Sequence, residues 1–451
     1  MKFLSNTLNN KIFIKISEII LILSIFLISR LLVFYSFELN INDPVYGYHL
    51  LDKKLLKDDL LKSILYLHHQ PFLWNLFNGI ILKIFNGNII YISKFFLYYH
   101  YLLTLTVVFF SIKISKIFNL SKKKRLLVIF FIILNPGIIF YENIFSYSHT
   151  TFCIFTILIY LIFKIFISYE KKLEVLIYFC IFLLGNIWAL FQPIILIPLF
   201  FFILRFYTKF NKISFIFSLI FFLISVAPIL KNKLIFGSFI NSSKTGQDFA
   251  TVFSDWQDYC GHPIRDKEIF TEKYFKKYQK KFSHPSLVGD LSHFNNLGMI
   301  EFGKNCFQKT IDRIFIDPKL YLKGRFYSFL ASHGKFSFDY IYPTPKGWSY
   351  FYKFFINLYK DDNYKLLRQV IIFTFMMSLY VYMFKYVFFS KYNLQLRKSI
   401  FLGGILYFYL LLVATFVSGT EQERSLYTGF AINIIFFILI LKNFLQSKLI
   451  K

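Results

Sequence analysis

This chain alternates long apolar runs with clusters of lysine. The 451-residue sequence is 56% hydrophobic and has a mean hydropathy of +0.53. Several of its runs approach the ~20 residues that a helix needs to cross a bilayer. Backbone polar groups in lipid must be paired within their own segment, so runs of this kind span as helices. We therefore expect an all-α polytopic membrane protein.

The formal net charge of +28 follows the same pattern. The lysines flank the apolar runs instead of forming one basic domain, which is typical of cytoplasmic loops and argues against nucleic-acid binding. Lys2, Lys11 and Lys15 lie at the start of the first run, which places the N-terminus in the cytoplasm and the following loop outside. No small-residue cleavage site follows that run, so we expect a retained helix.

The alternation of apolar runs with basic loops predicts about ten crossings. A short apolar piece at residues 71–85 would break this alternation if it crossed. We therefore expect it to be a juxtamembrane helix on the outer face, next to an amphipathic surface helix at residues 58–67. The expected spans are residues 12–36, 91–112, 126–141, 149–167, 174–190, 194–205, 213–230, 368–389, 400–417 and 426–441.

The charge and hydropathy pattern divides the chain into three parts. Residues 1–230 are expected to form a transmembrane module whose first outer loop covers residues 37–90. Residues 231–367 are polar and are expected to form a helical extracytoplasmic loop domain, and residues 368–451 carry the last spans.

The four cysteines divide in the same way. Cys153 and Cys180 lie in apolar runs and are read as buried small hydrophobes. Cys260 and Cys306 lie in the polar part, where a disulfide is one expectation if that part faces an oxidising compartment. No CxxC motif or Cys/His cluster suggests zinc.

Polar side chains gather, in this topology, at one membrane face. The first outer loop crowds acids and histidines together in a chain that is otherwise rich in Phe, Ile, Leu and Tyr. Polar groups are costly beside a membrane bundle, which favours a functional role for them. Because carboxylates from three distant parts of the chain share this face, we expect them to converge on one cavity. The residues expected there are Asp43, Asp52, Glu142, His149, Gln192, Glu421 and Glu423.

Five short motifs lie at or near the outer loops. They are Asp43-Pro44 after the first run, His68-His69-Gln70-Pro71-Phe72, Asn135-Pro136 with Glu142, the stretch Gly237 to Ser243 (GSFINSS), and Glu421-Gln422-Glu423-Arg424 before the last run.

In these motifs the chain resembles the GT-C superfamily of integral-membrane glycosyltransferases, and in particular the bacterial family 39-like relatives of protein O-mannosyltransferases and aminoarabinose transferases. The likeness covers most of the chain. Two positions depart from the family pattern. Phe72 stands where a His-x-Pro-Pro-Leu motif has its second proline, and Asn42 stands beside Asp43 where an Asp-Glu pair is usual.

The resemblance implies a polyprenyl-phosphate-linked sugar as donor and a hydroxyl acceptor on a lipid, glycan or protein, at the outer face of a bacterial inner membrane. Asp43, held extended by Pro44, is the expected base, with Asp52 as the alternative. Glu142 is the second expected catalytic group, either orienting the acceptor or holding a metal, since a carboxylate at a helix C-terminus is a poor cap. The expected substrate-binding residues are Asp52, His68, His69, Gln70, Gln192, Glu423 and Arg424.

Within this reading, Arg424 would offer a bidentate fork to the leaving phosphate, and His68 or His69 would add donors. A divalent cation, Mg²⁺ or Mn²⁺, stays open, because the sequence has no tight spacing of ligands.

Two other functions fit a chain with many spans and a large outer loop. A lipid-linked glycan polymerase, ligase or flippase is one, and Arg265, Arg313 and Arg325 in the loop keep it open. A transporter without chemistry is the other, but transporters favour matching halves and polar breaks near the midplane. The one-sided gathering of polar residues favours an interfacial enzyme.

Overall fold

The computed structural model describes residues 18–34, 50–143, 145–207, 210–263, 265–333, 394–417, 427–430 and 432–439, together with a few positions between 374 and 388. These residues form helices and turns, with no strand among them. The prediction of an all-α chain is therefore confirmed for the described residues.

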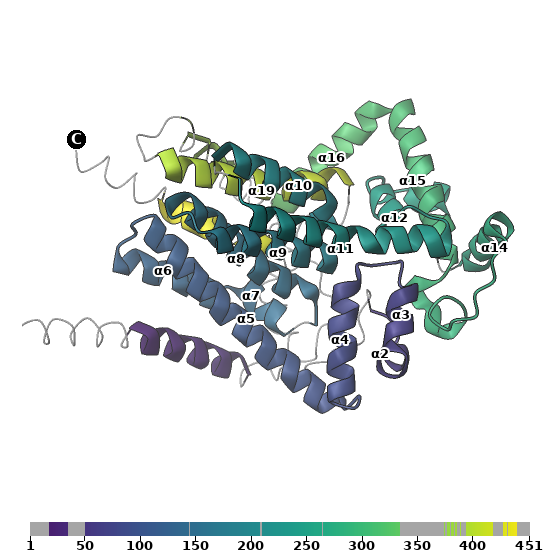
Figure 1. The fold of residues 1–451 in the computed structure, drawn as a ribbon, viewed down its shortest axis with the longest axis horizontal. Coiled ribbons are helices and arrows are strands. Elements are labelled where there is room, and N and C mark those ends of the chain that lie inside the picture. Colours follow the sequence, from purple (N-terminus) through teal and green to yellow (C-terminus); the bar gives the residue numbers. More distant parts are fainter. Residues whose placement is uncertain are drawn as a thin grey trace, which may run out of the picture.

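Four described helices are long and apolar enough to cross a membrane. They are α5 (Ile89–Ile117), α8 (Tyr147–Ile167), α11 (Lys212–Phe236) and residues Arg397–Phe416 of α19 (Leu394–Val417). In Figure 1, α8, α11 and α19 run in nearly the same direction and α5 lies obliquely beside α8.

Helix α8 is the centre of this bundle. It packs against α5, α19 and α9 (Lys171–Ile187), and 72% of its apolar window is buried, compared with 22% for α11. Ser146 begins α8 by accepting a hydrogen bond from the Ser148 N–H, and Asn88 begins α5 in the same way. Gly237 ends α11 in the left-handed region, at φ 71°.

The predicted span 126–141 is wrong as a single helix. The structure divides it into α6 (Lys122–Ile133) and α7 (Pro136–Glu142). Asn135 accepts a hydrogen bond from the Ile138 N–H through its side chain, and Pro136 follows as the first helical residue, where its missing N–H costs nothing. This local chemistry starts a new helix inside the apolar run.

The neighbouring expected spans are helical but short. The stretches 174–190 and 194–205 correspond to α9, of 17 residues, and α10 (Pro193–Tyr207), of 15 residues. The short helix η1 (Ala189–Phe191) and Gln192, at φ 29°, join them. Residues 18–34 of the first expected span are helical, whereas the spans 368–389 and 426–441 lie partly outside the described residues.

The first loop contains the helices expected at residues 58–67 and 71–85, and one more helix before them. Helices α2 (Lys53–Asp58) and α3 (Leu60–Tyr66) precede α4 (Phe72–Ile84), which begins directly after Pro71. Helix α4 packs against α2, α3 and α9, so that this group sits on one end of the bundle (Figure 1).

Residues 245–333 form a layer of helices around α15 (Gly298–Ile316), beside the end of α11 (Figure 1). Helix α15 packs against α12, α13, α14 and α16. The bounds of these elements are α12 (Thr245–Ala250), α13 (Trp256–Cys260), α14 (Lys267–Tyr278), η2 (Asp290–Asn295) and α16 (Pro318–His333).

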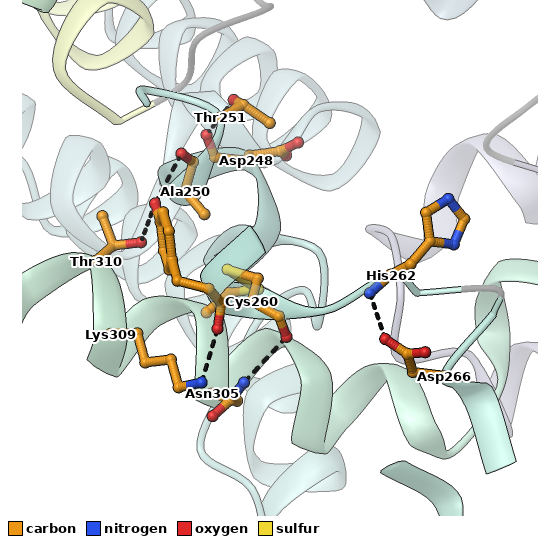
Figure 2. Close-up of a disulfide and its surroundings, with 11 residues drawn as sticks. Asp248, Ala250, Thr251, Cys260, His262, Asp266, Asn305, Lys309 and Thr310 are labelled. Carbon is orange, nitrogen blue, oxygen red and sulfur yellow. Dashed lines mark hydrogen bonds between the residues drawn. A yellow bond between two sulfur atoms is a disulfide. The ribbon is translucent and has the colours of Figure 1, made fainter. Parts of the chain in front are cut away.

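A disulfide joins α13 to α15, between Cys260 and Cys306, whose Cα atoms lie 4.9 Å apart. Figure 2 shows Asn305 and Lys309, one turn apart on α15, on the same side of α13. The Asn305 amide donates to the Cys260 carbonyl at 3.1 Å, and the Lys309 ammonium donates to the Tyr259 carbonyl at 2.7 Å. These bonds satisfy carbonyls that the end of α13 would otherwise leave open.

The contact between α12 and α15 depends on two glycines. A Cβ atom on Gly246 would lie 1.8 Å from the backbone oxygen of Gly303, so the backbones must separate to accept it. We expect Gly246→Ala to destabilise this layer by about 3 kcal/mol. Gly324→Ala on α16 is the control, because its Cβ would lie 3.7 Å from the nearest atom, the Val252 oxygen. Denaturation followed by tryptophan fluorescence compares the two variants, and equal stability would contradict the close packing.

Candidate functional site

The histidine pair of the first loop is held by residues far along the chain. The Asn295 side-chain oxygen accepts from the backbone N–H groups of His68 and His69, at 2.9 and 3.2 Å. The Ser243 N–H donates to the His68 carbonyl at 2.9 Å, and the Ser242 hydroxyl donates to the His69 carbonyl. Two of the motifs noted in the sequence, the histidine pair and the GSFINSS stretch, therefore meet in space.

The two imidazole rings differ in how many of their nitrogens are hydrogen-bonded. His68 Nε2 lies 2.9 Å from the Asn295 carbonyl and so carries the proton, while Nδ1 accepts from the Ser243 hydroxyl at 3.0 Å. His69 Nδ1 lies 3.4 Å from the same hydroxyl. His69 Nε2 is buried and has no hydrogen-bond partner among the described residues. His68 thus holds the loop, and His69 keeps one nitrogen uncommitted.

Both rings stay neutral at physiological pH. Burial, helped by the nearby Lys231 charge and partly opposed by the hydrogen bond to the Asn295 carbonyl, lowers the pKa of His68 to about 3. Burial, followed by the charges of Lys244 and His68, holds the pKa of His69 well below its usual range. Neither ring is therefore a cationic ligand for phosphate.

This depressed pKa of His68 makes stability depend on pH. As the pH falls, this imidazole takes up a proton near pH 6.5 in the unfolded chain but only near pH 3 in the folded chain. The contribution of His68 to the free energy of unfolding is therefore complete above pH 6.5 and declines as the pH falls towards 3. We expect the stability advantage of the wild type over His68→Gln to shrink by about 2 kcal/mol between pH 8 and pH 5. Denaturant titrations at both pH values measure it. A constant difference would contradict the assigned protonation.

A second polar cluster surrounds Glu142, at the end of α7. The Arg30 guanidinium, on the helix of residues 18–34, donates to both carboxylate oxygens, from Nε to Oε2 at 2.7 Å and from Nη2 to Oε1 at 2.6 Å. The Thr104 hydroxyl donates to Oε1 at 2.5 Å, and the His100 ring bonds the Glu142 carbonyl at 2.9 Å. Glu142 is only 1% exposed.

This cluster continues towards the C-terminal part of the chain. His149 Nε2 lies 3.0 Å from the Thr104 hydroxyl, and His149 Nδ1 lies 2.7 Å from the Tyr427 hydroxyl. The Tyr427 ring also stacks on Tyr141, with centroids 4.0 Å apart. His149 and Glu142, which we expected to converge, do meet through Thr104.

Glu142 has little capacity left for a ligand in this arrangement. Three charged or hydroxyl donors occupy its oxygens, which favours positioning over contact with acceptor or metal. No group of three or more His, Cys, Asp and Glu side chains in the described part of the chain is arranged to hold a metal ion.

The other predicted residues take separate places. Asp52 caps α2 by accepting from the Lys54 N–H at 2.8 Å, and it lies 3.8 Å from His293 Nε2. Gln70 lines a small pocket beside His69. Gln192 donates to the Ala189 carbonyl at 2.5 Å within its turn. Asp43, Glu421, Glu423 and Arg424 lie outside the described residues.

Sequence reasoning missed Arg30, Thr104, His100 and Asn295. The sequence carried a signal for Arg30, because an arginine inside an apolar run is costly and is expected to have a partner. The others are ordinary polar residues whose roles depend on contacts across the fold.

The described residues therefore form two polar centres, one around His68 and His69 and one around Glu142. No contact within the described ranges joins Asp52 to Glu142, and Asp43, Glu421 and Glu423 lie outside those ranges, so the single cavity expected from the sequence stays a prediction. Neither a protein-family model nor a curated protein matches the chain.

Proposed function

We propose that this protein is a membrane glycosyltransferase that moves a sugar from a polyprenyl-phosphate donor to a lipid, glycan or protein acceptor at the extracytoplasmic face of a bacterial inner membrane. The observation that carries the proposal is the buried cluster around Glu142. It joins ionisable and polar residues from five segments of the chain inside an apolar helical bundle. Such groups are costly near a membrane and are retained where function needs them.

The same proposal includes about ten crossings and an outer position for residues 231–367. The four long apolar helices supply part of that number. The bond between Cys260 and Cys306 supports the outer position, because structural disulfides persist in oxidising compartments.

In the proposed reaction the acceptor oxygen bonds to the anomeric carbon of the sugar as the bond from that carbon to the phosphate oxygen breaks. The phosphate leaves with the bonding electrons, and a carboxylate takes the acceptor proton. Asp43 is the proposed base, and Arg424 would bind the leaving phosphate through its planar fork.

Glu142 acts in this proposal through Arg30. The helix of residues 18–34 leads into the loop that carries Asp43, 13 positions after Arg30 in the sequence. By fixing Arg30 with two hydrogen bonds, Glu142 anchors that helix against α5 and α7. Glu142 is thus a positioning residue for the segment that bears the base.

The direct test uses purified full-length protein in lipid bilayers and a panel of polyprenyl-phosphate sugars. Asp43→Asn is expected to abolish transfer, while Asp52→Asn, which loses the charge but keeps an oxygen that can cap α2, is expected to retain it. Loss with Asp52→Asn and retention with Asp43→Asn would instead make Asp52 the base. A wild-type protein that transfers sugar from none of the donors would rule the proposal out.

The arginines that kept a polymerase or ligase open are already engaged. Arg325 donates to the carbonyls of Thr415 and Val252, both at 2.8 Å, and Arg313 pairs with Asp255 at 2.7 Å. Arg265 pairs with Asp266 at 3.0 Å. These contacts support structural roles for Arg325 and Arg313, whereas the Arg265 side chain is 73% exposed and keeps that alternative open.

A further inference from the structure

His149 is the link between the Glu142 cluster and the C-terminal part of the chain. It lies in the first turn of α8 and is completely buried. Its two ring nitrogens face different segments, Nδ1 the Tyr427 hydroxyl at 2.7 Å and Nε2 the Thr104 hydroxyl at 3.0 Å.

The backbone carbonyl of His100 fixes the direction of these bonds. It lies 3.2 Å from His149 Nε2 and can only accept, so Nε2 must carry a proton. A buried imidazole beside the Arg30 guanidinium is neutral, which leaves Nδ1 as an acceptor for the Tyr427 hydroxyl. The Thr104 hydroxyl then accepts from Nε2–H and donates its own proton to Glu142 Oε1.

We propose that Tyr427, His149 and Thr104 are positioning residues, forming a chain of hydrogen bonds that all point towards Glu142. The chain runs from the Tyr427 O–H to His149, from His149 to Thr104, and from Thr104 to the carboxylate. It moves no proton. It fixes the carboxylate that in turn holds Arg30.

The two ends of this chain are close in the sequence to the two segments that the proposed reaction needs. Arg30 is on the helix that leads to Asp43, and Tyr427 follows Arg424 by three residues in the sequence. The chain would therefore set the separation between the segment that bears the base and the segment that binds the phosphate. This role rests on the proposed glycosyltransferase function.

Two pairs of variants separate positioning from folding. Thr104→Val removes the hydroxyl at nearly constant shape, and Thr104→Ser keeps it. Tyr427→Phe removes the hydroxyl that His149 accepts from. Tyr407→Phe is its matched control, because that buried hydroxyl accepts from Asn433 at 2.8 Å and has no part in the chain.

The first readout needs no activity. Solid-state ¹⁵N NMR of histidine-labelled protein in lipid bilayers, with His149 assigned by comparison with His149→Gln, is expected to show a protonated Nε2 and an unprotonated Nδ1. Tyr427→Phe is expected to shift the Nδ1 resonance and Tyr407→Phe to leave it in place. A protonated Nδ1, or equal spectra for both variants, would overturn the chain.

The second readout is sugar transfer. Thr104→Val and Tyr427→Phe are expected to lower kcat by about 10- to 100-fold with little change in KM, because misplaced groups slow the chemical step. Thr104→Ser and Tyr407→Phe are expected to stay within about threefold. Transfer that is equal in Thr104→Val and Thr104→Ser would overturn the positioning role while leaving the glycosyltransferase function in place. Expected spectra without any wild-type transfer would retain the chain and reject the function.

Discussion

Glu142→Gln is expected to lower the rate of sugar transfer by about 100-fold, whereas Glu174→Gln leaves it within about threefold. Both carboxylates are fully buried and both accept from an arginine at 2.6 Å, Glu142 from Arg30 and Glu174 from Arg205. The two variants therefore remove the same kind of buried ion pair. The two ion pairs lie on opposite sides of the proposed topology. Glu174 lies at the start of α9, on the side that this topology puts in the cytoplasm.

The measurement is kcat at saturating polyprenyl-phosphate sugar, for variants matched in folded yield by size-exclusion chromatography. Glutamine at 142 keeps the shape but loses the charge that holds the guanidinium and one of the oxygens that accept from it. The helix leading to Asp43 then loses its anchor. Equal loss in both variants would mean that the ion pairs matter only for folding, and the special role of Glu142 would be wrong.

The fold could be predicted from sequence where one local signal dominates. The apolar runs that became α5, α8 and α11 have caps at Asn88, Ser146 and Asn211, and their existence followed from length and hydropathy. The break between α6 and α7 at Asn135 was not predicted, because the apolar run around it suggests one continuous helix. The Asn135-Pro136 pair is a helix start in its own right.

In the candidate site, too, residues with a local sequence signal could be predicted, and residues that depend on long-range contacts could not. Glu142 stood out because a carboxylate is unfavourable at a helix C-terminus, and the histidine pair stood out beside Pro71. Their partners did not, since Thr104 and Asn295 acquire a role only when segments distant in sequence pack together. Asp52 was predicted as a site residue, and the structure gives it the local role of a helix cap. The assignments of Asp43, Glu423 and Arg424 stay predictions that depend on the resemblance.

Removing the charge of Arg30 is expected to destabilise the protein by about 3–5 kcal/mol. The Arg30→Met variant fills a similar volume but leaves Glu142 as an uncompensated charge in the bundle, with only Thr104 donating to it. It also leaves the Ile133 carbonyl without the bond that Arg30 Nη1 makes at 2.5 Å. Unfolding in detergent, followed by circular dichroism, measures the loss.

A double variant tests whether the unpaired carboxylate is the cause. When Glu142→Gln is added to Arg30→Met, no charge remains to be desolvated, and we expect most of the lost stability to return. Arg205→Met is the comparison at the second ion pair. Its loss should be smaller, because the Arg205 side chain is 16% exposed against 5% for Arg30 and water can reach the site. If Arg30→Met is as stable as the double variant, the pair contributes no more than a surface ion pair, and Glu142 cannot be the anchor of the first helix.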